Sequence, residues 1–132
     1  MFDRLDMFQM AIGLARHAAA RQAVVARNIA NADTPGYRAQ DIADFATAWR
    51  QPDMRDGGVP SDLHVRGLRA RDPHADTLRL VPIDAGGAAD PNGNSVNLET
   101  EMLRGIEAQR AHSRALRIYG SALGILRTSL GR

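Results

Sequence analysis

The stretch that most strongly constrains the fold lies at residues 26–38 and reads ARNIANADTPGYR. It predicts the end of a helix followed by a tight turn, because Pro35 cannot continue a helix and Gly36 permits a positive φ angle. Asn31 suits a position near the helix C-terminus, since its side chain can bond nearby backbone groups. Tyr37 supplies an aromatic anchor with a polar tip. We therefore expect a forced turn directly after an N-terminal helix.

The residues before this turn predict one long helix over 1–32. No proline and a single glycine, Gly13, occur between Phe2 and Asn31, and Asp3 is a candidate N-cap. Apolar residues recur at spacings of three and four, which marks one face of a helix. That face comprises Leu5, Phe8, Ile12, Ala15, Ala19, Ala26 and Ile29.

A second long helix is predicted over residues 96–132. Ser95 or Asn97 can cap its start, Glu99 and Glu101 place acidic groups in its first turn, and Gly131 closes it. Its apolar stripe comprises Leu98, Met102, Ile106, Leu116, Leu123, Leu126 and Leu130. Two apolar stripes of this length predict helices that pack on each other or on neighbouring subunits.

The predicted fold class is therefore mainly α, with the two terminal helices paired as an antiparallel, coiled-coil-like hairpin. The aromatic content is only 5%, which favours long helices in close contact over a thick core. We expect a helix seam in which large side chains from the two stripes meet. From the first helix it takes Leu5, Phe8, Ile12 and Ile29, and from the second Leu116, Leu123, Leu126 and Leu130.

The middle of the chain predicts two further segments. Residues 33–51 contain the turn and a short amphipathic helix from Asp41 to Arg50. Residues 52–95 are rich in Pro and Gly and predict a long loop or a small β-hairpin. The two strand candidates in this segment are Asp62–Leu68 and Thr77–Ile83, the second of them interrupted by Pro82.

Composition and charge exclude several classes of protein. The 132 residues include no Cys, which removes disulfides and thiolate chemistry, and no apolar run approaches the roughly 20 residues of a membrane span. The N-terminus lacks the basic-then-apolar layout of a cleaved signal peptide. All 17 basic residues are Arg, and the net charge is +2.

The charges are unevenly distributed along the chain. Residues 1–32 hold four Arg and two Asp, and residues 102–132 hold six Arg and one Glu, whereas residues 33–101 hold seven Arg and twelve acids. Basic helical ends with an acidic middle suit heterologous packing between subunits.

No motif predicts catalysis, a metal site or a cofactor. The four His residues are scattered without metal-ligand spacing, and neither a GxSxG motif nor a P-loop occurs. The Arg-rich stretch at 66–71 could meet phosphates, although acidic residues flank it and no aromatic residue interleaves to stack bases.

A nucleic-acid-binding protein and a small helical adaptor or export chaperone are the alternative interpretations. A folded, soluble free chain would favour the adaptor, and steeply salt-dependent DNA binding would favour the nucleic-acid reading.

The string NIANADTPGYRAQDI at residues 28–42 closely resembles the N-terminal signature of the flagellar axial proteins, in particular their proximal-rod type. The stretch PNGNSVNLETEM at residues 91–102 is similar to the segment that enters the last helix of that family. The resemblance covers about residues 2–50 and 91–130. In the last helix, Ala108 and His112 stand where the family usually carries Asn and Tyr.

This resemblance implies a structural subunit of the bacterial flagellar basal-body rod, not an enzyme. Such subunits pass through the flagellar type III export system without a cleaved signal peptide, fold on assembly and occupy the rod in the periplasmic space. The implied partners are other rod proteins, copies of the chain itself, and the export gate and membrane ring at the rod base, with no nucleic acid and no small-molecule substrate. Shaping of the turn and its subunit contacts falls to Asn28, Asn31, Thr34, Pro35, Gly36 and Tyr37.

Overall fold

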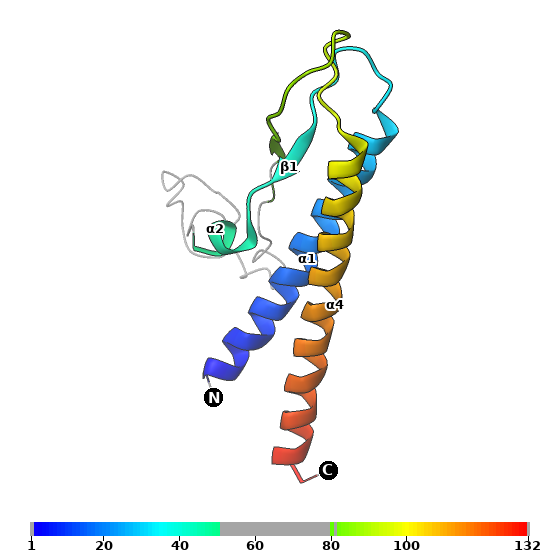
Figure 1. Ribbon diagram of the computed structural model, residues 1–132. Coiled ribbons are helices and arrows are strands. Elements are labelled where there is room, and N and C mark those ends of the chain that lie inside the picture. The colour runs from blue at the N-terminus through cyan, green and yellow to red at the C-terminus, as the bar shows by residue number, and fades with distance from the viewer. Residues whose placement is uncertain (1, 51–79, 81, 132) are drawn as a thin grey trace, which may run out of the picture.

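The computed structural model describes residues 2–50, 80 and 82–131, and it is mainly helical (Figure 1). Two long helices, α1 (Phe2–Ala30) and α4 (Leu98–Ser129), pack against each other as an antiparallel hairpin. A side arm lies along α1 and contains β1 (Gln40–Ile42), α2 (Phe45–Arg50) and β2 (Pro82–Asp84). The predicted fold class is confirmed.

The ends of both helices follow the local chemistry of the sequence. The side chain of Asn97 accepts a hydrogen bond from the Thr100 N–H at 3.0 Å and caps α4, as one of the two predicted candidates. Gly131 adopts a φ of 71° just after α4, which is the left-handed conformation that glycine tolerates best. The prediction of Asp3 as an N-cap is wrong, because α1 already begins at Phe2 and Asp3 lies within its first turn.

Small residues at heptad spacing form the contact between the two helices. Ala11, Ala18 and Val25 of α1 are buried, and so are Ala108, Ala115 and Ala122 of α4. These six residues are the alanine seam. Small side chains let two helix backbones approach closely, and Gly105 continues the contact because a Cβ placed there would lie 3.6 Å from a methyl carbon of Val25.

The predicted seam of large side chains is wrong for four of its eight members. Ile12, Ile29, Leu116 and Leu130 are 41–76% exposed. Ile12, Ile29 and Leu116 lie one or four residues along the helix from the buried positions, and the close approach of the backbones leaves them outside the contact. Leu130 lies just past the end of α4.

The other predicted seam residues lie nearer the contact. The Phe8 ring packs edge-to-face on Tyr119 with centroids 5.4 Å apart, and Leu123 and Leu126 are half-buried. The side chain of Leu5 lies outside the described part of the chain.

A two-stranded antiparallel sheet forms in the middle of the chain, where β1 pairs with β2. The predicted helix from Asp41 to Arg50 is shorter than expected: α2 begins at Phe45, because residues 40–42 pair with 82–84 instead. Pro82 starts its strand, a position where the missing N–H costs no ladder hydrogen bond. The candidate strand Asp62–Leu68 and most of Thr77–Ile83 lie outside the described residues.

In the described part of the chain, no helix combines the length and the hydropathy that crossing a bilayer requires.

The alanine seam predicts a sharp dependence on side-chain size. Replacing Ala115 with Leu inserts three carbons between closely packed backbones and should lower the free energy of unfolding by about 1–3 kcal/mol. Ser121→Leu places the same side chain on an exposed position of α4 and is the matched control. Urea unfolding followed by circular dichroism measures both variants, and equal stabilities would contradict the packing described here.

Candidate functional site

Asn28 lies at the point where α1, the turn and α4 meet. Its amide nitrogen donates to the Gln40 carbonyl at 2.7 Å and to the Glu101 carboxylate at 2.9 Å. Its amide oxygen accepts from the Tyr37 hydroxyl at 3.2 Å and from the Gln40 N–H at 3.1 Å. Asn28 is fully buried, and these four hydrogen bonds compensate for the loss of water around its amide.

A chain of ion pairs continues from this junction. Glu101 is 1% exposed, and it accepts a hydrogen bond from Arg104 at 2.7 Å. Asp41 of β1 accepts two hydrogen bonds from Arg21 of α1, at 3.0 and 3.1 Å, and lies 3.5 Å from Arg104 of α4. Asp41 therefore joins the side arm to both long helices.

Two opposing effects act on the pKa of Asp41. Partial burial raises the pKa, whereas hydrogen bonds from Arg21 and the Ile42 N–H, together with the charges of Arg21 and Arg104, lower it. The net pKa lies below the ordinary value for an aspartate, so the folded chain favours the ionised carboxylate.

Asn94 ties the end of α1 to the segment that leads into α4. Its amide nitrogen lies 2.7–3.0 Å from the backbone carbonyls of Asn31, Ala32 and Thr34. These carbonyl groups belong to the turn that directly follows α1. The buried amide of Asn94 thus completes the hydrogen bonding of a turn some sixty residues earlier in the chain.

Backbone contacts reinforce the same connection. The Gly36 N–H donates to the Asn92 carbonyl and the Ser95 N–H to the Tyr37 carbonyl, both at 3.0 Å. A Cβ on Gly93 would lie 3.3 Å from the Cα of Gly36, so the two backbones meet without room for a side chain. Residues 31–39 and 90–97 therefore form one unit, which we call the turn knot.

The structure brings the predicted turn residues together. Asn28 and Tyr37 bond each other, Asn31 donates to the Arg27 carbonyl at 2.8 Å, and the Thr34 hydroxyl donates to Asn31 at 3.3 Å. Gly36 has a φ of 73°, as its place in the turn predicts. Their contacts with other subunits stay a prediction.

Sequence reasoning missed the polar partners of these residues. Glu101 was expected only as an acidic group in the first turn of a helix, and Asp41 only as the start of one. In the sequence, the one feature that points to burial of Glu101 and Asp41 is that each charged residue stands beside an apolar neighbour. The roles of Asn94 and Ser95 depend on tertiary contacts that no local pattern encodes.

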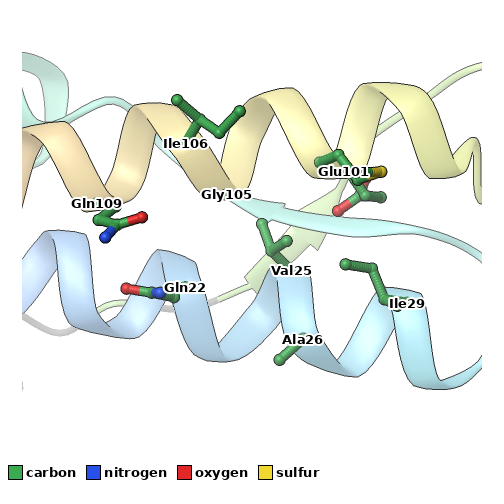
Figure 2. A pocket seen from close by; sticks show the side chains of 9 residues that line it. Gln22, Val25, Ala26, Ile29, Glu101, Gly105, Ile106 and Gln109 are labelled. Carbon is green, nitrogen blue, oxygen red and sulfur yellow. The ribbon is translucent and has the colours of Figure 1, made fainter.

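An open groove runs between the two helices near the turn knot. It has a volume of about 300 Å³, and Figure 2 shows Gln22 and Val25 of α1 and Gln109 of α4 projecting into it, with Ile106 pointing outward from α4. Apolar residues predominate in the lining, which comprises Gln22, Val25, Ala26, Ile29, Glu101, Met102, Gly105, Ile106 and Gln109.

The predicted apolar stripes lie along this same side of the hairpin. Ile29, Met102 and Ile106 line the groove and are largely exposed, and Ile12 and Leu116 continue the two stripes away from the turn. Exposed apolar side chains on one side of a molecule are typical of surfaces that contact other proteins. Within the described residues, no three His, Asp or Glu side chains are grouped as metal ligands.

Comparison with known proteins identifies the family. A family model described as "Flagella basal body rod protein" matches residues 11–38, which run from the first buried alanine of α1 through the turn. The flagellar basal body rod protein FlgB of Salmonella typhimurium is 35% identical over 135 residues, covering 93% of this chain and 92% of the relative. This chain belongs to the FlgB family.

Other members of the FlgB family support the assignment. FlgB of Escherichia coli K12 is 34% identical over 113 residues, covering 76% of each chain. FlgB of Agrobacterium fabrum is 29% identical over 108 residues, covering 82% of this chain and 80% of the relative. The resemblance of the turn sequence to flagellar axial proteins of the proximal-rod type is thereby confirmed.

The close approach in the turn knot predicts different outcomes for two glycines. Gly93→Ala combines a φ of 81° with a Cβ 3.3 Å from Gly36, whereas Gly86→Ala has a φ of 67° and no atom within 4 Å. Both substitutions carry the cost of a left-handed alanine, about 1–2 kcal/mol, and only the first also forces two backbones apart. Thermal unfolding should therefore show the larger loss for Gly93→Ala, and equal losses would contradict the close contact.

The ion pairs of Asp41 predict a pH dependence of stability. Because the folded chain lowers its pKa, Asp41 contributes stability above the pKa of about 3.8 that it has in the unfolded chain, and this contribution is lost as the pH falls below that value. Asp41→Asn should be less stable than the parent at neutral pH, and the difference should shrink below about pH 4. Circular dichroism between pH 2 and 7, with an osmolyte to favour the folded form, measures this. Asp44→Asn, at an exposed neighbouring position, is the control.

Proposed function

We propose that this chain, a structural subunit of the flagellar basal-body rod, completes its fold when helices of neighbouring subunits cover the groove and the stripes beside it. The observation that carries the proposal is the way small and large apolar side chains are separated onto different sides of both helices. Small side chains, mainly alanines, face inward and hold the hairpin together, while several large apolar side chains face outward. We call the outward surface the groove face, and it comprises Ile12, Ile29, Met102, Ile106 and Leu116.

The energetics favour folding that is coupled to assembly. A seam of alanines removes little apolar surface from water, and burial contributes only about 25 cal/mol per Å². Ordering the long helices costs roughly 1–2 kcal/mol per residue in backbone entropy. Covering the groove face would add the burial of large side chains that the single chain leaves in water, so neighbours supply what the isolated hairpin lacks.

The family supports a set of partners and a route of delivery. In this proposal the chain contacts other rod proteins, copies of itself, and the export gate and membrane ring at the rod base. It reaches the periplasmic part of the rod through the flagellar type III system without a cleaved signal peptide. Its role is structural and involves no catalysis. The exposed side chains of Thr34 and Pro35, on a turn held rigid by the turn knot, are available for subunit contacts.

Mass spectrometry of purified hook–basal bodies tests this role. The chain should be present at a few copies per particle and should remain after the hook is removed. Recovery only from the soluble cytoplasmic fraction of flagellated cells would contradict a rod subunit and would favour an export chaperone.

A substitution on the groove face gives a sharper test. Ile106→Asp places a charge at a 48% exposed position, so the single chain should tolerate it, whereas a covering helix would have to bury the carboxylate. Ile125→Asp, 52% exposed on α4 and outside the groove lining, is the matched control. We expect Ile106→Asp to reduce the amount of chain in basal bodies at least tenfold and Ile125→Asp to leave it near the parent level. Equal incorporation would show that the groove face stays uncovered.

A further inference from the structure

The second half of α4 carries a basic surface that faces away from α1. Arg110, Arg114 and Arg117 are spaced four and three residues apart, which places them on one face of the helix. All three are exposed, and the alanine seam occupies the opposite side. After Glu107 the rest of the chain contains no acidic residue. We call these three arginines the basic face.

The basic face is unpaired within the described residues. Arg21, Arg38 and Arg104 form the ion pairs that involve arginine in this part of the chain, and no member of the basic face takes part. Glu107, three residues before Arg110, pairs with Arg21 of α1 at 3.8 Å. Glu99 lies too far along the helix, since the Cα atoms of Glu99 and Arg114 are separated by about 22 Å. That distance exceeds the screening length of about 8–10 Å at physiological salt.

The opposite charge gathers at the closed end of the hairpin. Asp33 and Asp90 belong to the turn knot, Glu99 lies in the first turn of α4, and all three are exposed. The hydrogen bonds of Asn94 fix the backbone around Asp33, and Asp90 is held by its own N–H, which donates to the Asn94 carbonyl at 2.8 Å. We call Asp33, Asp90 and Glu99 the acidic end.

We propose that the basic face of one copy docks the acidic end of a second copy, so that neighbouring hairpins pack side by side with a stagger of roughly 20 Å. The inference rests on the proposed rod function and specifies one of its subunit contacts. Three unpaired arginines and three carboxylates on rigid elements form complementary surfaces that a single chain cannot bring together. Such a contact is heterologous and repeats from subunit to subunit, as a helical assembly requires.

Exposed apolar side chains border both surfaces. Leu103 lies on the same face of α4 as Arg110, seven residues earlier, and Leu98 lies next to Glu99. Covering these leucines would remove water around the charges and strengthen their attraction. Complementary charges of this kind fix register and exclude wrong partners more than they add affinity. The contact therefore sets the stagger, while the groove face supplies apolar burial.

Charge exchange in the full-length chain, expressed in place of the native copy, tests the contact. Arg114→Glu with Arg117→Glu reverses the basic face, and Asp33→Arg with Asp90→Arg reverses the acidic end. Each pair should reduce the chain recovered in hook–basal bodies about tenfold or more. The four substitutions together should restore most of it, because the two surfaces are complementary again. Arg127→Glu and Asp6→Arg, both exposed and outside the two surfaces, are the matched controls and should change little.

The outcomes separate this contact from the rod function itself. Normal incorporation of either reversed pair would overturn the contact and leave the rod function standing. Failure of the fourfold variant to recover, when its circular dichroism matches that of the unsubstituted chain, would also overturn the contact, because the partner of at least one surface would then be a different rod protein. Absence of the unsubstituted chain from basal bodies would instead overturn the proposed function.

Discussion

The structure depends on one buried amide. Asn28 bonds the backbone of β1, the hydroxyl of Tyr37 and the carboxylate of Glu101, so a single side chain joins the end of α1 to the turn and strand that follow it and to α4, 73 residues later in the chain. A buried polar group is costly unless it is fully bonded, and Asn28 is fully bonded only when the turn, the strand and α4 are all in place. Any other register of the hairpin would therefore carry the free-energy cost of leaving the Asn28 amide incompletely hydrogen-bonded.

This constraint explains how two helices that meet mainly through alanines can pack in a single register. Alanine contacts are nearly interchangeable, because shifting one helix by seven residues would bring alanine against alanine again. Such a shift would break the buried hydrogen bond between Asn28 and Glu101 and leave each of these groups one partner short. The polar junction thus sets the register, the alanines permit close approach, and the large side chains remain available on the surface.

Local patterns in the sequence predicted the elements but not the way in which they face each other. Pro35 and Gly36 define a turn, Asn97 caps a helix, and two apolar stripes at helical spacing indicate a helical hairpin. Half of the predicted seam residues lie on the outer surface instead, because hydrophobicity identifies a face that is buried in an assembly as readily as one buried in a monomer. The structural roles of Asn94 and Asp41 could not be predicted, since their partners lie in distant segments. The sequence does not distinguish a polar side chain in water from one that bonds within the protein.

The outward placement of Ile12, Ile29 and Leu116 suits a subunit whose folding is completed by contacts with neighbouring subunits, as proposed above. A hairpin that buried its largest side chains internally would be stable alone and would offer a polar exterior to other chains. A hairpin held by alanines retains apolar surface for assembly, and it relies on Asn28, Asp41 and Asn94 for geometry. The small apolar interior and the dense polar junction thus have complementary roles. The polar junction fixes the register of the hairpin within the chain, and in the proposed assembly contacts between chains bury most of the large apolar side chains.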